Sequence, residues 1–554
     1  MAFSDIAYKA FQDIVGDENV TNDPVLCQAY SRVQWLPAGV VQRERCGLKM
    51  RPVCVVMPGS VEEAQNLIKV ANRYKVPFIP RGSGFTPQAF STQEGTVIVD
   101  PKRMNRILEL NEKDMYAVIE PYVAFVQLQA EAMKYGLYIP TPLAGSQVSC
   151  LANYSWHGAY GNSWITGIGA QNLLGFELIL PDGEIVRSGS MAQPGGGNFW
   201  NDGPGPDLRG FLRGGMFGHA GGIGFVTKIS CKLWQWAGPE VFPTEGNGNL
   251  KFSGTLGEDW KWYMIEFPFA YPEEEVKELK ASAELFYEMG KAEIGEVATH
   301  LAQQFLLTYS SVTKQDLHDN MNNKVFPKGY CVVALAGKTS KEQLAYEEKV
   351  LRGIVEKVGG SFVSEEDPAY RTWIKRAANE WIRFGNAQRL ARPSDNFSIG
   401  SSNVDSIDQI VYEIRESNKV ERKLYDEKKL GEGMVQPLSL HGGWISPQEY
   451  GHWCLHTTDV FPEQDPKMCN DAMAIIGEVT KSMFERKSAA EAIHVLGPAY
   501  DMFGPILGNV HVYVKALKRE FDPNNISNPG YATTPDVMSE EEWKKMMSAM
   551  SGGN

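Results

Sequence analysis

Apolar positions before about residue 240 switch repeatedly between the spacing of helices and the spacing of strands. Residues 62–76 carry apolar side chains at helical spacing, so we expect a helix there that ends before Pro77. A second helix is expected over 124–135, and a β-hairpin over 173–187 that turns at Pro181-Asp182-Gly183. Short runs of β-branched and apolar residues predict strands at 78–79, 96–100, 116–120 and 223–234.

The pattern changes near residue 240, where prolines and glycines at 239, 243, 246 and 248 mark a break between two regions. Charged helical patterns follow at 273–298, 341–358, 405–429 and 468–487, and a β-like run lies at 435–460. A last helix is expected over 510–530, ending in a Pro/Asn/Gly turn. The mixture of helices and strands predicts an α+β protein.

Composition narrows the class of protein. The chain has 554 residues, 43% hydrophobic and 22% charged, which is typical of a globular protein with two to four domains. Its formal charge of −13 disfavours nucleic-acid binding, since phosphodiester backbones are also negative. The first 16 residues predict an amphipathic helix, and no stretch approaches the ~18 apolar residues of a membrane span. Eight scattered cysteines without a C-x-x-C pair indicate reduced thiols, so we expect a cytoplasmic protein.

Three loops rich in small residues lie far apart in the sequence. They occupy residues 80–86, directly after a predicted strand, 142–161, and 218–224. Glycine permits positive φ and lets successive backbone N–H groups converge on an anion such as a diphosphate. One extended ligand that touches all three loops explains them better than three independent turns. None of them opens a helix with G-x-G-x-x-G, which disfavours a Rossmann site.

Six segments together resemble one flavoprotein family, the vanillyl-alcohol oxidase and p-cresol methylhydroxylase superfamily. They are PRGSGF (80–85), PLAGSQV (142–148), LPDGEIVRSGS (180–190), GPGPDLRGFL (203–212), GGIGFVTKISCKLW (221–234) and LKREFDPNNISNPG (517–530). The resemblance implies a two-subdomain, PCMH-type FAD-binding domain, split between residues 1–238 and 496–534. A cap or substrate domain with an antiparallel sheet would occupy 239–495, and 535–554 would be a tail.

The resemblance also implies which residues bind FAD. They are Pro80, Arg81, Gly82, Ser83, Gly84, Phe85, Thr86, Pro142, Gly145, Ser146, Ser149, Asn153, Gly158, Gly161, Gly222, Gly224, Phe225, Val226 and Asn528. Family members that link the flavin covalently carry a His where this chain has Phe85 or Thr86, or a His or Tyr near 394–399, where it has neither. We therefore expect non-covalent FAD. The Tyr-Arg pair of the phenol-oxidising members is absent from 487–495, which disfavours a para-alkylphenol substrate.

A cluster of histidines in the predicted cap is the candidate for acid-base chemistry. His441, His452 and His456 lie among aromatic residues, and histidine titrates near neutral pH, so each is a candidate general base or hydrogen-bond donor. The pattern equally allows structural histidines. A metal site is disfavoured because residues 452 and 456 lie in a predicted strand, which would hold the two side chains ~13 Å apart. Arg389 is a candidate for holding a substrate carboxylate.

These features together predict an FAD-dependent oxidoreductase, a dehydrogenase or oxidase, that moves a hydride from a small alcohol, aromatic or hydroxy-acid substrate to flavin N5. Two alternatives stay open. One is a metal-assisted 2-hydroxy-acid dehydrogenase, and the other is a non-redox transferase similar to alkyl-glycerone-phosphate synthase, or an electron-conduit subunit. The electron acceptor would be oxygen, a quinone, a cytochrome or an electron-transfer flavoprotein. We expect a homo-oligomer or a subunit of a redox complex.

Overall fold

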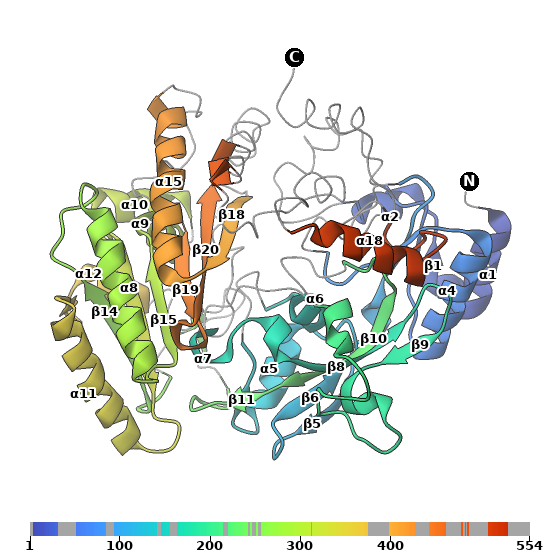
Figure 1. Cartoon of the computed structure of the whole chain (residues 1–554), viewed down its shortest axis with the longest axis horizontal. Coiled ribbons are helices and arrows are strands. Elements are labelled where there is room, and N and C mark those ends of the chain that lie inside the picture. The colour runs from blue at the N-terminus through green and yellow to red at the C-terminus, as the bar shows by residue number, and fades with distance from the viewer. Residues whose placement is uncertain are drawn as a thin grey trace.

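The computed structural model describes most of the chain. The described residues are 4–31, 51–84, 93–140, 146–155, 163–213, 220–241, 244–245, 251–252, 256–311, 313–374, 398–426, 443–460, 478–479, 482–483, 485–486 and 508–529. They form two bodies that lie side by side (Figure 1). We call residues 4–241 the N-terminal half, and the larger sheet of the other body the cap sheet.

The N-terminal half begins with a small sheet and three helices. Its strand order is β1 (Val20–Thr21), β2 (Cys54–Val56), β4 (Val97–Val99) and β3 (Phe78–Pro80), the last three of which run parallel. The helices are α1 (Asp5–Val15), α2 (Pro24–Ala29) and α4 (Val61–Tyr74). Ser60 caps α4, whose buried face carries Leu67 and Ile68 at the expected spacing. The predicted helix over 62–76 and the amphipathic N-terminal helix are confirmed.

An antiparallel sheet of five strands completes the N-terminal half. Its order is β5 (Ile107–Asn111), β6 (Tyr116–Ile119), β10 (Phe225–Lys232), β8 (Leu173–Ile179) and β9 (Ile185–Arg187). Strands β8 and β9 form the predicted hairpin. Around this sheet lie α5 (Phe125–Met133), α6 (Cys150–Ser155), α7 (Ser163–Thr166) and the pair of β7 (Leu137–Tyr138) with β11 (Trp234–Gln235). A two-stranded ribbon follows, made of β12 (Thr244–Glu245) and β13 (Lys251–Phe252).

The cap sheet has seven antiparallel strands. Their order is β17 (Ser361–Phe362), β14 (Trp260–Glu266), β16 (Tyr330–Ala336), β15 (Val297–Leu301), β19 (Trp444–Gln448), β20 (Trp453–Val460) and β18 (Ser398–Asp405). Side chains alternate between its faces, so Val333 and Leu335 belong to one hydrophobic cluster and Val332 and Ala334 to another.

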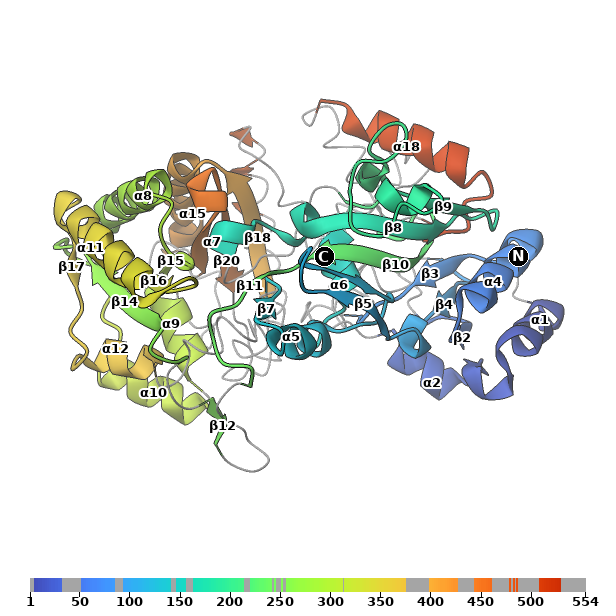
Figure 2. The same cartoon turned by 90° about the horizontal axis from the view of Figure 1, so that it is seen from below.

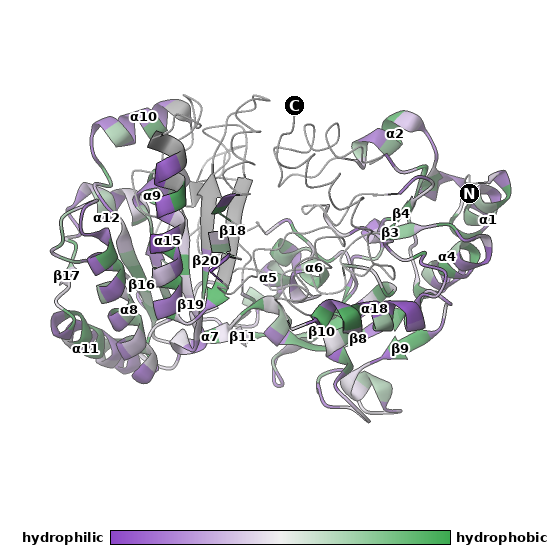
Figure 3. Ribbon diagram, turned by 45° about the horizontal axis from the view of Figure 1, so that its top comes forward, coloured by the Kyte–Doolittle hydropathy of each residue, from purple (hydrophilic) through white to green (hydrophobic). Residues whose placement is uncertain are grey.

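Helices cover both faces of the cap sheet. The cluster that contains Val333 packs under α8 (Glu275–Lys291), α11 (Lys341–Lys357) and α15 (Ile407–Asp426). The cluster that contains Val332 includes residues of α9 (Gln303–Ser310), α10 (Lys314–Asn322) and α12 (Pro368–Trp373). Figure 3 shows hydrophilic and hydrophobic stripes on α11 and α15, as expected for helices with one buried side. We call the face under α8, α11 and α15 the helix-covered face.

One helix prediction was too long. The run expected over 273–298 ends at Lys291, and β15 begins at Val297. Between them Glu293 and Gly295 have positive φ angles of 50° and 94°, which a continuous α-helix does not allow. The chain therefore turns back into the sheet, where periodicity alone suggested more helix.

The C-terminal segment returns to the N-terminal half. Helix α18 (Val510–Phe521) lies beside that half and away from the cap helices (Figures 1 and 2). After it, Ser527 forms a parallel β-bridge with Phe78, so the end of the chain pairs with β3. The α+β fold class is confirmed. Among the helices that the structure describes, none is long and apolar enough to cross a membrane.

Candidate cofactor and substrate site

The first two loops rich in small residues lie against each other. Ser149 donates its backbone N–H to Ser83 Oγ at 3.3 Å, although 66 positions separate the two residues. A Cβ atom on Gly82 would lie 3.4 Å from Ser149 Cβ, an ordinary contact distance, so the two backbones come close at this point. Below the contact, Ser149 Oγ donates to Pro121 O at 2.8 Å and Asn153 Nδ2 donates to Ser149 O at 3.1 Å.

The third loop lies beside the first. A Cβ atom on Gly221, where φ is 72°, would lie 3.0 Å from Pro80 Cδ, at the end of β3. Gly224 has a different reason to be glycine, because a Cβ atom there would lie 2.2 Å from the carbonyl oxygen of Ile179. It allows β10 to pair closely with β8. Phe225 and Val226 follow on β10 with buried side chains, one in each of two hydrophobic clusters.

The C-terminal segment holds the third loop from outside. Lys518 Nζ donates to Gly222 O at 2.6 Å, Ser527 Oγ to Gly221 O at 2.6 Å, and Asn528 Nδ2 to Ala220 O at 2.5 Å. Four segments from across the sequence, around residues 82, 149, 221 and 527, therefore meet at the end of β3. This is the meeting of separated loops that the sequence predicted.

Positive charge gathers beside the first loop. The Arg81 guanidinium lies 4.9 Å above the Tyr30 ring and donates to Tyr30 O, and Lys102 Nζ lies 3.0 Å from Asp100 Oδ2. Tyr30 also donates to Asp100, at 2.8 Å. Burial lowers the pKa of Arg81, yet guanidinium stays protonated in proteins. Two cations and one carboxylate give this cluster a net positive charge, which favours an anionic ligand.

Several of these groups escaped the sequence reasoning. Tyr30 and Lys102 lie outside the quoted motifs, and Lys518 and Ser527 lie inside one but were not named as site residues, because their role depends on contacts between distant segments. One signal was available for Lys518, which stands four residues before Asp522 inside a segment already singled out. Of the candidates named from the sequence, Phe85, Thr86, Pro142, Gly145, Gly158, Gly161, Arg389 and His441 lie outside the described residues.

His456 lies on the helix-covered face of the cap sheet. It pairs with Ile445 on β19, which pairs with His300 on β15, and paired residues point to the same side. Ile445 packs in the cluster under α8, and His300 Nε2 lies 3.1 Å from Glu278 Oε1 on that helix. His456 is 1% exposed, and burial, with a smaller effect of His300, lowers its pKa to about 3.

His452 has a different environment. It is exposed and follows the 3-10 turn Glu449–Gly451, directly before β20. His456 lies in a strand as predicted, but the prediction was wrong for His452, whose backbone ends the 3-10 turn before the strand begins. Among the described residues, no group of three or more His, Cys, Asp or Glu side chains could hold a metal ion.

The other face of the cap sheet carries an aromatic cluster. Phe305 and Tyr309 of α9 stack with ring centres 5.4 Å apart, Phe305 lies 5.3 Å from Trp444, and Tyr309 lies 6.3 Å from Trp373. These residues belong to the same core cluster as Tyr138, Phe176 and Trp236 of the N-terminal half. All four side chains are almost fully buried, and they belong to the core that joins this face of the cap sheet to the N-terminal half.

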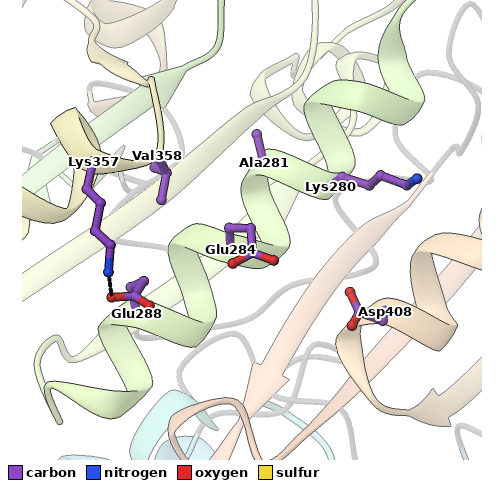
Figure 4. Close-up of a pocket in the computed structure, with 7 residues that line it drawn as sticks. All are labelled: Lys280, Ala281, Glu284, Glu288, Lys357, Val358 and Asp408. Atoms are coloured by element: carbon purple, nitrogen blue, oxygen red, sulfur yellow. Dashed lines mark hydrogen bonds and ion pairs between the residues drawn. The ribbon is translucent and has the colours of Figure 1, made fainter.

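A groove on the helix-covered face is a poor candidate for a substrate site. It has a volume of about 440 Å³ and is lined by Lys280, Ala281, Glu284, Glu288, Lys357, Val358 and Asp408 (Figure 4). Its charges pair locally, since Lys357 Nζ lies 2.6 Å from Glu288, and Lys291 and Lys357 lower the pKa of Glu288 to about 2. The groove lies among α8, α11 and α15, on the opposite side of the cap sheet from the aromatic cluster.

Comparison with known proteins identifies the loop-bearing region. Residues 52–189 match the family model described as FAD binding domain. Residues 52–189 are an FAD-binding domain. The overall fold is similar to that of p-cresol methylhydroxylase with substrate bound, which aligns over 96% of both chains with a TM-score of 0.72 and 19% identity. Alkyldihydroxyacetonephosphate synthase also aligns, over 95% of this chain and 86% of its own, with a TM-score of 0.64 and 14% identity.

Relatives by sequence include several named dehydrogenases. The 4-cresol dehydrogenase [hydroxylating] flavoprotein subunit of Pseudomonas putida is 28% identical over 250 residues, 43% of each chain. The mitochondrial D-lactate dehydrogenase [cytochrome] of Arabidopsis thaliana is 27% identical over 184 residues, 33% of this chain and 30% of its own. The chain thus matches less than half the length of each of these relatives.

The residues present fit FAD. A diphosphate needs close backbone approach and positive charge, and the FAD-binding domain supplies both through Gly82, Gly84 and the Arg81–Lys102 cluster. Gly84 has a φ of 71°, and a Cβ atom there would lie 2.3 Å from Arg81 Nη2. Glycine at this position therefore leaves room for the guanidinium beside the loop. Arg81 and Ser83 would hold the diphosphate, with Ser149 positioning Ser83, and the cofactor would supply two-electron redox chemistry.

Proposed function

We propose that this protein is an FAD-dependent oxidoreductase that takes a hydride from a small alcohol, aromatic or hydroxy-acid substrate. The observation that carries the proposal is the meeting of four separated backbone segments beside a positive cluster. Such a site suits a dinucleotide, and FAD would accept the hydride at flavin N5. The substrate would lie between the cofactor and the aromatic cluster of Phe305, Tyr309, Trp373 and Trp444.

The residues of the chain would bind the substrate and move its proton. Among the histidines, we retain His441 and His452 as proton acceptors for a substrate hydroxyl, since histidine titrates near neutral pH. We assign His456 to the cap core, because it is buried on the helix-covered face and stays neutral at pH 7. Arg389 is proposed to hold a substrate carboxylate, where there is one.

Further properties follow from the same proposal. FAD would be bound non-covalently, since Phe85 and Thr86 stand where linked members of the family carry His. The reduced cofactor would pass electrons to oxygen, a quinone, a cytochrome or an electron-transfer flavoprotein. We further propose a cytoplasmic homo-oligomer or a subunit of a redox complex.

Two spectra test the proposal. The purified protein should show the absorption of oxidised flavin, and acid precipitation should leave the yellow colour in the supernatant. Anaerobic addition of 4-cresol, vanillyl alcohol, glycolate, D-lactate and D-2-hydroxyglutarate, one at a time, should bleach the flavin with at least one of them. A yellow pellet would contradict the non-covalent linkage, and a colourless protein that does not take up added FAD would contradict the cofactor assignment.

The second candidate is a metal-assisted 2-hydroxy-acid dehydrogenase. It is favoured by relatives named D-lactate dehydrogenase and D-2-hydroxyglutarate dehydrogenase, the latter 30% identical over 185 residues. A divalent ion at one equivalent per chain, whose removal abolishes bleaching by hydroxy acids, would support it. The likeness to alkyldihydroxyacetonephosphate synthase favours a third outcome, a transferase without net redox turnover. Flavin that no reducing substrate bleaches would point to that class.

A further inference from the structure

Three successive carbonyl groups of the third loop are held by side chains that come from about 300 residues away. Asn528 donates to the carbonyl of residue 220, Ser527 to that of residue 221, and Lys518 to that of residue 222. In a planar trans peptide the N–H group points opposite to the carbonyl. The N–H groups that follow each of these carbonyls are therefore turned away from the C-terminal segment.

Lys518 is the centre of this arrangement. Its side chain is fully buried, and Nζ donates to Gly222 O at 2.6 Å, Ser527 O at 2.5 Å and Asp522 Oδ2 at 2.5 Å. An ammonium group has three protons, so this set satisfies all of them. Burial lowers the pKa of Lys518, whereas the charge of Asp522 raises it. A buried cation with a carboxylate and two carbonyl partners is fixed in one position.

Asp522 extends the same network to the backbone after α18. Its carboxylate accepts from the N–H of Ile526 at 3.0 Å and of Ser527 at 2.8 Å. The following residues join β3, where Phe78 N donates to Ile526 O and Asn528 N donates to Phe78 O, each at 2.7 Å. The Lys518–Asp522 pair thus connects the third loop with the strand that leads into the first loop.

We propose that Lys518, Asp522, Ser527 and Asn528 form a clamp. The clamp fixes residues 220–224, the described part of the third loop, in the conformation that binds FAD. The inference rests on the proposed function and deepens it, since it assigns part of the cofactor affinity to residues that hold the loop from its far side. Lys518 and Asp522 are positioning residues, because their polar atoms form hydrogen bonds to other groups of the protein. Ser527 has the same role through Gly221.

The experiment compares FAD binding by apoprotein variants in a fluorescence titration. Lys518→Met keeps an unbranched side chain one atom shorter and removes the three donors, so Gly222 O and Ser527 O lose their bonds from Lys518. We expect its Kd for FAD to rise at least ~10-fold, since buried carbonyl groups lose a charged partner. Ser527→Ala removes one neutral bond to Gly221 O, and we expect a rise of about threefold. Arg519→Met, an exposed neighbour on α18, is the matched control and should stay within about twofold.

Hydrogen exchange supplies a readout that a general loss of stability would not give. In Lys518→Met, the amides of residues 220–224 should exchange faster, while those of the distant strand β16 keep the parental rate. A folded Lys518→Met protein with parental FAD affinity and parental exchange at 220–224 would overturn the clamp. If this variant does not fold, Ser527→Ala decides, and its binding FAD as the parent does would overturn the clamp as well.

FAD binding by the parental protein distinguishes a failure of the proposed function from a failure of the clamp. If the parental apoprotein binds no FAD, the proposed function fails and the clamp fails with it. If the parent binds FAD and reduces it with a substrate while Lys518→Met and Ser527→Ala bind it equally well, the clamp alone is overturned.

Discussion

Tyr138 donates its hydroxyl hydrogen bond to Glu296 Oε1 at 2.7 Å, across the boundary between the N-terminal half and the cap sheet. Both side chains are buried, and Lys338 Nζ lies 2.6 Å from the other carboxylate oxygen. Burial, together with the neighbouring Glu296, raises the pKa of Tyr138 well above its ordinary value, so the hydroxyl keeps its proton. Near it the Trp236 ring lies 5.3 Å from Trp260 of the cap sheet. The two bodies therefore share one polar and one apolar contact at this point.

Replacing Tyr138 with Phe should weaken this boundary. The change removes one hydroxyl and leaves the ring contact with Trp236, so Glu296 loses a buried hydrogen-bond donor. We expect the free energy of unfolding to fall by about 2 kcal/mol. Urea unfolding followed by tryptophan fluorescence measures it. Tyr135→Phe, which alters an exposed tyrosine three residues earlier, is the control and should change stability by less than ~0.5 kcal/mol. Equal stability of the Tyr138 variant and the parent would show that the bond contributes nothing.

His456 should make the stability of the protein depend on pH. Its pKa falls from 6.5 to about 3 in the fold, so between these values the unfolded chain binds a proton that the native chain does not. The lowered pKa leaves stability unaffected above pH 6.5 and lowers it progressively as the pH falls toward 3. At pH 5 the loss due to this residue should be about 2 kcal/mol relative to pH 7.5.

The variant His456→Gln tests this contribution. Glutamine does not titrate, so the variant should lose less stability than the parent between pH 7.5 and pH 5. The buried pair of His300 and Glu278 on the same face is present in both proteins, so the difference between them reports His456 together with its interaction with His300. Urea unfolding at each pH gives the comparison. His318→Gln, at an exposed position on α10, should retain the parental pH dependence. Parallel pH curves for His456→Gln and the parent would contradict the assignment.

Arg81 should contribute to the affinity for FAD through its charge. Replacing it with Met removes the cation beside the first loop, and we expect the Kd for FAD to rise at least ~10-fold at low salt. Raising the salt concentration should weaken binding more in the parent than in the variant, because screening acts on a charge that the variant lacks. Arg73→Met is a matched control, since Arg73 lies 5.6 Å above the ring of Tyr74 but at an exposed position on helix α4. Unchanged affinity in Arg81→Met would place the diphosphate elsewhere.

Local pattern was sufficient for much of the N-terminal half. The spacing of apolar residues gave α4 and α5, and the turn at Pro181-Asp182-Gly183 gave the hairpin of β8 and β9. These features are determined by neighbours in the sequence, because helix periodicity and turn geometry act over a few residues. The same reasoning failed at 292–298, where positive φ angles end α8 and the chain enters the sheet. There the pairing of β15 with β16 and β19 decided the structure.

The sequence by itself determined that this chain carries loops able to approach a dinucleotide, since glycine and serine leave the backbone accessible wherever they fold. Only the tertiary structure decided that Ser149 contacts Ser83 and that Lys518 donates to the carbonyl of Gly222. It also decided that His456 is buried on the helix-covered face whereas His452 is exposed. The physical reason is that burial, charge pairing and carbonyl direction are properties of contacts between distant segments. Such contacts produce no periodic pattern in the sequence, so the sequence alone does not predict them.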